Sequence, residues 1–147
     1  MTLGPPSYQQ HVRVPLHFWL IGLVILLWNC WGLLGAFAAQ VRLLPDMPEE
    51  AIAYLERQPL WFTLFSDLSP LAGAAGALAL LVQSRWAPPL FLIQIAVLLV
   101  GNGYEMLIGT SPLLTVPEVR WSTGFLLALL VAQTTYALRM AKRGLLG

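Results

Sequence analysis

Long apolar stretches alternate with short polar connections along this chain, and four stretches are long enough to cross a membrane. They lie at about residues 16–41, 60–82, 89–109 and 121–138. A hydrocarbon core about 30 Å thick needs roughly 20 predominantly apolar residues per helix. A proline introduces each stretch, at Pro15, Pro59, Pro88 and Pro117, where the first-turn N–H groups have no intrahelical partner. The pattern predicts an all-α fold: an antiparallel bundle of four transmembrane helices in one membrane domain, residues 1–147.

The connection after the first span, residues 42–59, carries a short pattern of its own. Asp46 precedes Glu49 by three residues, and acidic residues at this spacing are typical of a first helical turn. Ile52 and Leu55 would then share one face and lie toward the membrane surface. We therefore expect a short interfacial helix in the first outer loop.

The composition agrees with a membrane environment and excludes several classes of protein. Of the 147 residues, 58% are hydrophobic and 10% are charged, whereas a soluble domain is about 25% charged. A chain this apolar is not intrinsically disordered, and it has too few polar side chains to cover a soluble globule. The net charge of +1 gives no reason to expect a nucleic-acid partner. The single cysteine, Cys30, excludes an intrachain disulfide.

The distribution of basic residues predicts the orientation in the membrane. With four spans, the N-terminus, the turn between the second and third spans and the C-terminus share one side. The charged residues on that side are all basic: Arg13, Arg85, Arg139, Lys142 and Arg143. The opposite side mixes both signs: Arg42, Arg57 and Arg120 with Asp46, Glu49, Glu50, Glu56 and Glu118. Because short cytoplasmic segments are enriched in Lys and Arg, both termini are expected in the cytoplasm.

The first span has an alternative interpretation as a secretory signal peptide. Arg13, the apolar run and Ala36-Phe37-Ala38 match its basic start and small-residue cleavage site. The apolar core of a signal peptide is only about 7–15 residues long, whereas this run covers residues 16–41. The length favours a retained span. Cleavage would leave three spans and place the mature N-terminus outside.

Small and polar residues form a stripe along one face of every span. The stripes hold Asn29 in the first span, Asp67 in the second, Gln94 and Glu105 in the third, and Gln133 in the fourth. Two interpretations remain open. In one, small residues and buried amides hold the helices together; in the other, the stripes line a site that contacts a solute.

The two carboxylates are the strongest sign of a site, because a charge at the bilayer centre costs roughly 2.5–3.5 kcal/mol. Asp67 lies about 10 Å and Glu105 about 6 Å from the outer end of its helix. Each is expected to pair with Arg42 or Arg120, or to stay protonated. Pro70 is expected to kink the helix beside Asp67. The predicted substrate-binding residues are Asp67, Glu105, Asn29, Gln94, Asn102 and Arg120.

The pattern contains no signal for catalysis or for a cofactor. No serine has a histidine at a matching depth on another span for nucleophilic chemistry. His11 and His17 are six residues apart, which does not match the i, i+4 spacing of a metal pair. We expect no enzymatic activity, no cofactor and no metal.

A resemblance to one family rests on runs in the first three spans. These runs are FWLIGLVILLWNCWGLLGAF from Phe18 to Phe37, Pro59-Leu60-Trp61, the glycines Gly73 and Gly76, and SRWAPPLF from Ser84 to Phe91. In them the chain resembles small four-helix bacterial inner-membrane proteins carried as hypothetical proteins or, loosely, as "sugar transporter". The resemblance implies four helices, an inner-membrane location and a small solute such as a sugar. Members have small apolar residues at the positions of Asp67 and Pro70, so the resemblance implies no role for Asp67.

Two functions follow from these observations. The first is binding or transport of a small solute through a polar pocket in the outer leaflet, by a homo-oligomer. The alternative is an accessory or scaffold subunit of a larger membrane complex, in which the polar residues serve packing and the acidic outer loop docks a partner. The lipid bilayer is an expected partner in both.

Overall fold

The computed structural model describes residues 14–41, 49–109 and 117–147. Within these ranges the chain forms only helices: α1 (Leu16–Gln40), α2 (Glu49–Arg57), α3 (Leu60–Leu81), α4 (Ala87–Leu107) and α6 (Pro117–Lys142). All but α2 are long and apolar enough to cross a membrane. The predicted all-α four-helix fold is confirmed. The last helix exceeds its predicted span of 121–138 at both ends, because polar residues there extend the helix beyond the apolar run.

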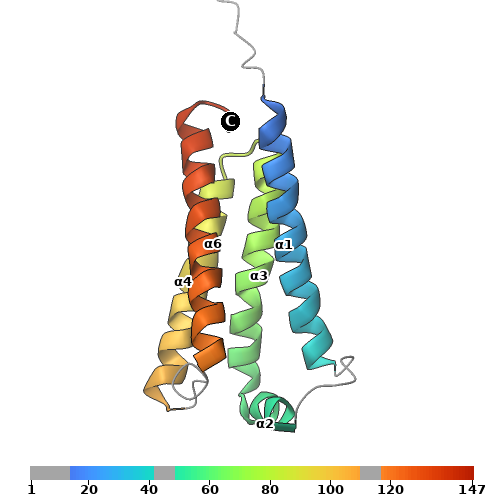
Figure 1. Cartoon of the computed structure of the whole chain (residues 1–147), viewed down its shortest axis with the longest axis vertical. Helices are drawn as coiled ribbons and strands as arrows, with labels where there is room; N and C mark the ends of the chain where they lie inside the picture. Colours follow the sequence, from blue (N-terminus) through green and yellow to red (C-terminus); the bar gives the residue numbers. More distant parts are fainter. Residues whose placement is uncertain (1–13, 42–48, 110–116) are drawn as a thin grey trace, which may run out of the picture.

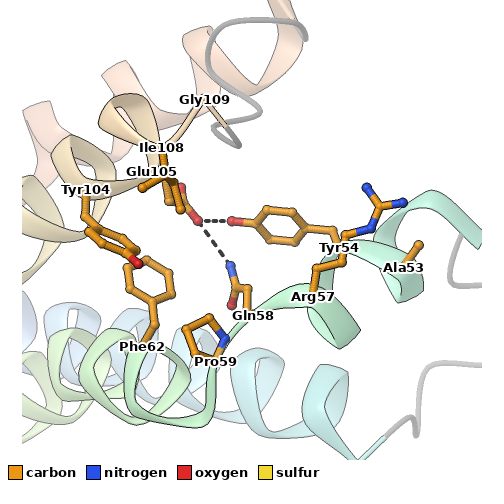
Figure 2. Close-up of a pocket in the computed structure, with 10 residues that line it drawn as sticks. All are labelled: Ala53, Tyr54, Arg57, Gln58, Pro59, Phe62, Tyr104, Glu105, Ile108 and Gly109. Carbon is orange, nitrogen blue, oxygen red and sulfur yellow. Dashed lines mark hydrogen bonds between the residues drawn. The ribbon is translucent and has the colours of Figure 1, made fainter.

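The four long helices stand side by side, and successive long helices run in opposite directions (Figure 1). α3 packs against α1 and α4, and α4 also packs against α6. α2 lies across one end of the bundle and contacts α4 through a hydrogen bond from the Tyr54 hydroxyl to the Glu105 carboxylate (Figure 2). We call this the α2 end. The opposite end is the basic end, defined by Arg85, Arg139, Lys142 and Arg143.

Proline marks the start of each long helix, as predicted. Pro15 and Pro59 are the N-cap residues of α1 and α3. Their carbonyl oxygens accept hydrogen bonds of 2.9 Å from the backbone N–H groups of Phe18 and Phe62, three residues on. Pro88 lies in the first turn of α4, and Pro117 is the first residue of α6. The short helix predicted in the first outer loop is α2; its expected beginning at Asp46 lies outside the described residues.

Small residues on α3 let the neighbouring helices approach closely. The buried positions in the middle of this helix are Ala72, Gly73, Ala74, Gly76 and Ala77. A Cβ atom on Gly76 would lie 2.9 Å from the ring of Phe91, which is closer than carbon atoms pack. The glycine therefore sets the distance between α3 and α4. Pro70 lies inside α3, which continues to Leu81.

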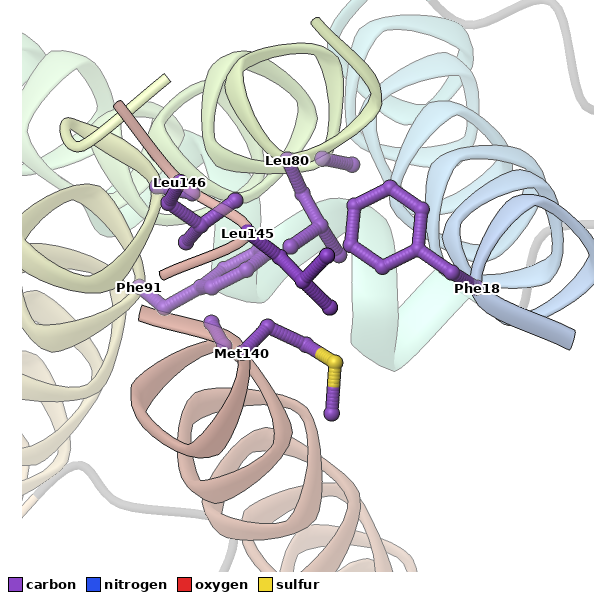
Figure 3. Close-up of a cluster of buried hydrophobic side chains, with 9 residues drawn as sticks. Phe18, Leu80, Phe91, Met140, Leu145 and Leu146 are labelled. Atoms are coloured by element: carbon purple, nitrogen blue, oxygen red, sulfur yellow. The ribbon is translucent and has the colours of Figure 1, made fainter. Parts of the chain in front are cut away.

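The basic end is closed by a cluster of buried apolar side chains from α1, α3, α4, α6 and the segment after α6 (Figure 3). The cluster includes Phe18, Leu80, Phe91, Met140, Leu145 and Leu146. α6 is followed by Gly144, whose φ of +70° suits glycine. The chain then turns back, and the N–H of Leu145 bonds to the carbonyl of Met140 at 3.1 Å.

The segment after α6 is also tied to the turn between α3 and α4. The N–H of Gly147 donates to the carbonyl of Gln83 at 2.8 Å, and the N–H of Arg85 donates to the carbonyl of Gly147 at 3.1 Å. Leu145 and Leu146 are thereby held inside the bundle at 7% and 9% exposure. Two distant parts of the chain thus close the basic end together.

Replacing Leu145 with alanine tests this closure. We expect Leu145→Ala to lower the free energy of unfolding by about 2 kcal/mol, because it leaves a cavity among packed side chains. Leu107→Ala is the matched control, since Leu107 is 89% exposed and its loss should change stability by less than about 0.5 kcal/mol. Denaturation by SDS, followed by circular dichroism, measures both. Equal stability of the two variants would contradict the packing role of Leu145.

Candidate functional site

The structure distributes the predicted site residues over several separate places. Asn29 and Gln94 lie in the middle of the bundle, and Glu105 lies at the α2 end. Asp67 and Arg120 lie on more exposed parts of α3 and α6. Of the six predicted residues, Asn29, Asp67, Gln94, Asn102, Glu105 and Arg120, Asn102 and Glu105 line one hollow together and Arg120 borders another. The role of the six in binding a substrate stays a prediction.

Three amide side chains form a closed ring of hydrogen bonds in the middle of the bundle. Gln94 Nε2 donates to Asn29 Oδ1 at 2.7 Å, Asn29 Nδ2 donates to Gln133 Oε1 at 3.3 Å, and Gln133 Nε2 donates to Gln94 Oε1 at 2.6 Å. Asn29 Nδ2 also donates to the carbonyl of Ile25 at 2.8 Å. The exposures are 3% for Asn29, 4% for Gln94 and 6% for Gln133. We call this arrangement the amide ring.

α3 contributes no amide to the ring but leaves space for it. A Cβ atom on Gly73 of α3 would lie 1.9 Å from Asn29 Oδ1 and 2.4 Å from Gln94 Nε2, so only glycine leaves room there. One turn earlier, the Ser69 hydroxyl donates to the backbone carbonyl of Gln94 at 3.2 Å. α1, α3, α4 and α6 are thus joined at one level, and Asn29 and Gln94 use their amides to hold helices together.

Glu105 borders a cavity of about 440 Å³ at the α2 end (Figure 2). Its carboxylate accepts hydrogen bonds from the Tyr54 hydroxyl and, at 3.1 Å, from Gln58 Nε2. Both donors come from α2 and the residue that follows it, so this short helix positions the carboxylate. The remaining lining residues are Ala53, Arg57, Pro59, Phe62, Tyr104, Ile108 and Gly109. We call this space the Glu105 cavity.

Aromatic rings build one wall of the Glu105 cavity. The ring centroids of Phe62 and Tyr104 are 5.1 Å apart, and Trp61 packs edge-on against Tyr104 at the same distance. Such contacts hold aromatic rings in fixed positions. The cavity therefore combines apolar ring faces with one carboxylate, an amide and the Arg57 side chain. This combination suits a small polar solute with an apolar face.

Asp67 has a different partner from Glu105. Gln40 Nε2 of α1 lies 2.8 Å from both oxygens of the Asp67 carboxylate, in an exposed setting. Arg42, one of the two arginines expected to pair with the carboxylates, lies outside the described residues. Arg120 is exposed and borders a separate hollow with Pro117, Trp121 and Gly124. Within the described ranges, neither carboxylate bonds to Arg120.

Asn102 borders a small hollow of about 80 Å³ beside the Glu105 cavity. Its Nδ2 donates to the carbonyl of Leu98 on its own helix at 2.8 Å, which leaves its side-chain oxygen for another group. Phe62 and Glu105 line this hollow and the larger cavity alike. Asn102 is thus a predicted site residue whose hollow shares two lining residues with the Glu105 cavity.

Tyr54 and Gln58 are the site residues that the sequence analysis missed. They are four residues apart, a spacing that places side chains on one helical face, and this was the available signal. The apolar pattern of this segment instead draws attention to Ile52 and Leu55, which are expected to face the membrane surface. In the structure these two residues line a hollow against Gln40 at the end of α1.

No protein-family model, curated protein or solved structure matches this chain. Among the described residues, no group of three histidine, cysteine, aspartate or glutamate side chains is placed to hold a metal ion.

Replacing Gly73 tests the amide ring. We expect Gly73→Ala to lower the free energy of unfolding by about 1–3 kcal/mol, because the added methyl displaces buried amides from their partners. Gly32→Ala is the matched control, since a Cβ atom there meets nothing within 4 Å. Thermal unfolding in detergent compares the two. If Gly73→Ala proved as stable as Gly32→Ala, the ring would not join the helices as described.

Proposed function

We propose that this chain is a multi-pass protein of the bacterial inner membrane, with cytoplasmic termini, that binds a small polar solute in the Glu105 cavity. The observation that carries the proposal is the Glu105 carboxylate, held by Tyr54 and Gln58 beside the rings of Phe62 and Tyr104. The orientation is supported by the charges, because the basic end carries Arg85, Arg139, Lys142 and Arg143 without a carboxylate. The Glu105 cavity then opens toward the outer face.

The chemistry of the cavity favours a sugar-like solute. Ring faces pack against the C–H groups of such a molecule, and a carboxylate and an amide form hydrogen bonds with its hydroxyl groups. The resemblance of the sequence to small proteins labelled "sugar transporter" agrees with this choice. Arg57 adds a cation at the rim, which would also accept a solute with a negative group.

The amide ring bears on whether one copy could transport the solute. Asn29, Gln94 and Gln133 bond to one another and are buried in the middle of the bundle, so they obstruct a path for a solute through a single copy. Transport would therefore need a path between copies in a homo-oligomer. Binding at the outer face needs only one copy, and it is the function we propose for the single chain.

Neutralising Glu105 tests the proposed site. We expect Glu105→Gln to weaken solute binding by about 10- to 100-fold, because it removes the charge from the hydrogen bonds that the carboxylate forms. Tyr54→Phe should weaken binding less, since the charge remains. The measurement is calorimetric titration of the purified protein with a panel of monosaccharides and disaccharides.

The matched control for this titration is Glu118→Gln. Glu118 is exposed in the first turn of α6 and does not line the cavity. Its variant should bind like the unchanged protein, and both variants should unfold at the same temperature. Unchanged affinity in Glu105→Gln would refute the site, and failure of every sugar to bind would refute the solute class.

A second candidate function is that of an accessory subunit in a larger membrane complex, and the Asp67–Gln40 pair favours it. This polar pair is exposed although it lies on helices that cross the membrane, and a partner helix would shield it from lipid. Under this alternative, a stoichiometric partner should co-purify in mild detergent, and Asp67→Leu should release it. A lone chain or a homo-oligomer in both preparations would contradict the accessory role.

A further inference from the structure

An apolar groove of about 350 Å³ lies between α1 and α6, away from the Glu105 cavity. α1 packs mainly against α3, and α6 packs mainly against α4, which leaves the two helices apart from each other over this stretch. The groove is lined by Ile21, Val24, Ile25 and Trp28 from α1 and by Leu129, Ala132, Gln133 and Tyr136 from α6. We call it the α1–α6 groove.

The groove has the depth and the limits of a site for one acyl chain. Its lining covers seven residue steps on each helix, which is about 10 Å at 1.5 Å per residue and most of the roughly 15 Å thickness of one leaflet's hydrocarbon. At the middle of the bundle, the hydrogen bond between Asn29 and Gln133 joins the two helices. Toward the basic end, the rings of Phe18 and Tyr136 lie 6.5 Å apart. On α1 the groove lies entirely on the basic-end side of Asn29, whereas on α6 it extends from Tyr136 past Gln133 to Leu129.

Positive charge lies beyond the end of the groove that faces the basic end. Arg143 is exposed and follows Tyr136, which lines the groove, by seven residues, or about two helical turns. Arg139 and Lys142 are exposed on the same end of α6. Neither α1 nor the part of α6 after Glu118 contains an aspartate or glutamate. An occupant with a negatively charged headgroup at this level meets only attractive charges from these two helices.

The Tyr136 hydroxyl is a second sign that an occupant belongs here. It is buried, and within the described parts of the chain it is the one buried side-chain polar atom without a hydrogen-bond partner. A buried hydroxyl without a partner costs free energy. A phosphate or ester oxygen arriving between Arg143 and Tyr136 would supply the missing acceptor.

We propose that the α1–α6 groove binds one anionic phospholipid, with an acyl chain against Trp28 and Ala132 and the phosphate beside Arg143. The arrangement follows the general rule that basic pockets between membrane helices bind anionic headgroups. The proposal is independent of the solute at the opposite end of the bundle. It commits to a lipid as the occupant, and a second copy of the chain in the same groove is the competing outcome.

Native mass spectrometry of the full chain tests the proposal with dioleoyl phosphatidylglycerol and dioleoyl phosphatidylcholine as probes. The unchanged protein should retain one phosphatidylglycerol in preference to phosphatidylcholine. Arg143→Gln should reduce that preference by about fivefold, the effect of one basic residue near a membrane surface. Arg85→Gln is the matched control, because it removes the same charge at the same end, but from the turn between α3 and α4, two helices that do not line the groove.

Filling the groove provides a second, independent variant. Ala132→Trp should remove most of the retained lipid, whereas Ala128→Trp should retain it, because Ala128 is exposed on the same helix but does not line the groove. Equal retention of the two lipids by the unchanged protein would overturn the proposal. Equal effects of the two variants in either pair would also overturn the proposal. A lipid-free dimer that Ala132→Trp converts to monomer would overturn it as well, because a second copy of the chain would then be the occupant of the groove.

Discussion

The packing of this protein depends on three amides that must satisfy one another inside a membrane. Hydrocarbon supplies no hydrogen-bond partners, so a buried amide needs a donor and an acceptor from the protein. Asn29, Gln94 and Gln133 meet this need from three helices, and Gly73 on the fourth leaves the space. Sliding or rotating α1, α4 or α6 would strain or break these bonds, and moving α3 would displace Gly73 from the space it leaves for them. The position of each helix relative to the others is thereby set at one level.

The helix orientations that are set at the amide ring also determine the shape of the Glu105 cavity. Gln94 and Glu105 are eleven residues apart on α4, and Phe62 and Gly73 are eleven residues apart on α3. Eleven residues make just over three full helical turns at 3.6 residues per turn, so each pair lies on the same face of its helix. The helix faces that meet in the amide ring are therefore those that form the cavity about 16 Å away. A change in the packing of the amide ring would therefore also change the shape of the cavity.

The fold was predictable from sequence to a greater extent than the site was. Hydropathy and the prolines located the spans, because the bilayer imposes length and apolarity on every crossing segment. The inward faces of Asn29 and Gln94 followed from helical periodicity. Periodicity does not specify which inward groups meet, because mutual hydrogen bonding and contact with a solute produce the same pattern of polar residues along a helix. Tyr54 reaches Glu105 only because α2 folds back across the bundle. Arg120 lies in the first turn of α6 and borders a separate hollow, a placement that periodicity along one helix does not give.

The hydrogen bonds of the amide ring all run in one direction around the ring. Donation runs from Gln94 to Asn29, from Asn29 to Gln133 and from Gln133 back to Gln94. Reversing it would require all three amides to flip together, and a flipped Asn29 would turn its oxygen toward the carbonyl of Ile25, to which it now donates. The carbonyl of Ile25 on α1 thus favours one of the two possible directions of donation around the ring. An aspartate has the shape of Asn29 but not its N–H groups. Deamidation of this single side chain would therefore remove the hydrogen bonds that it donates to Gln133 and to the carbonyl of Ile25, in the middle of the membrane.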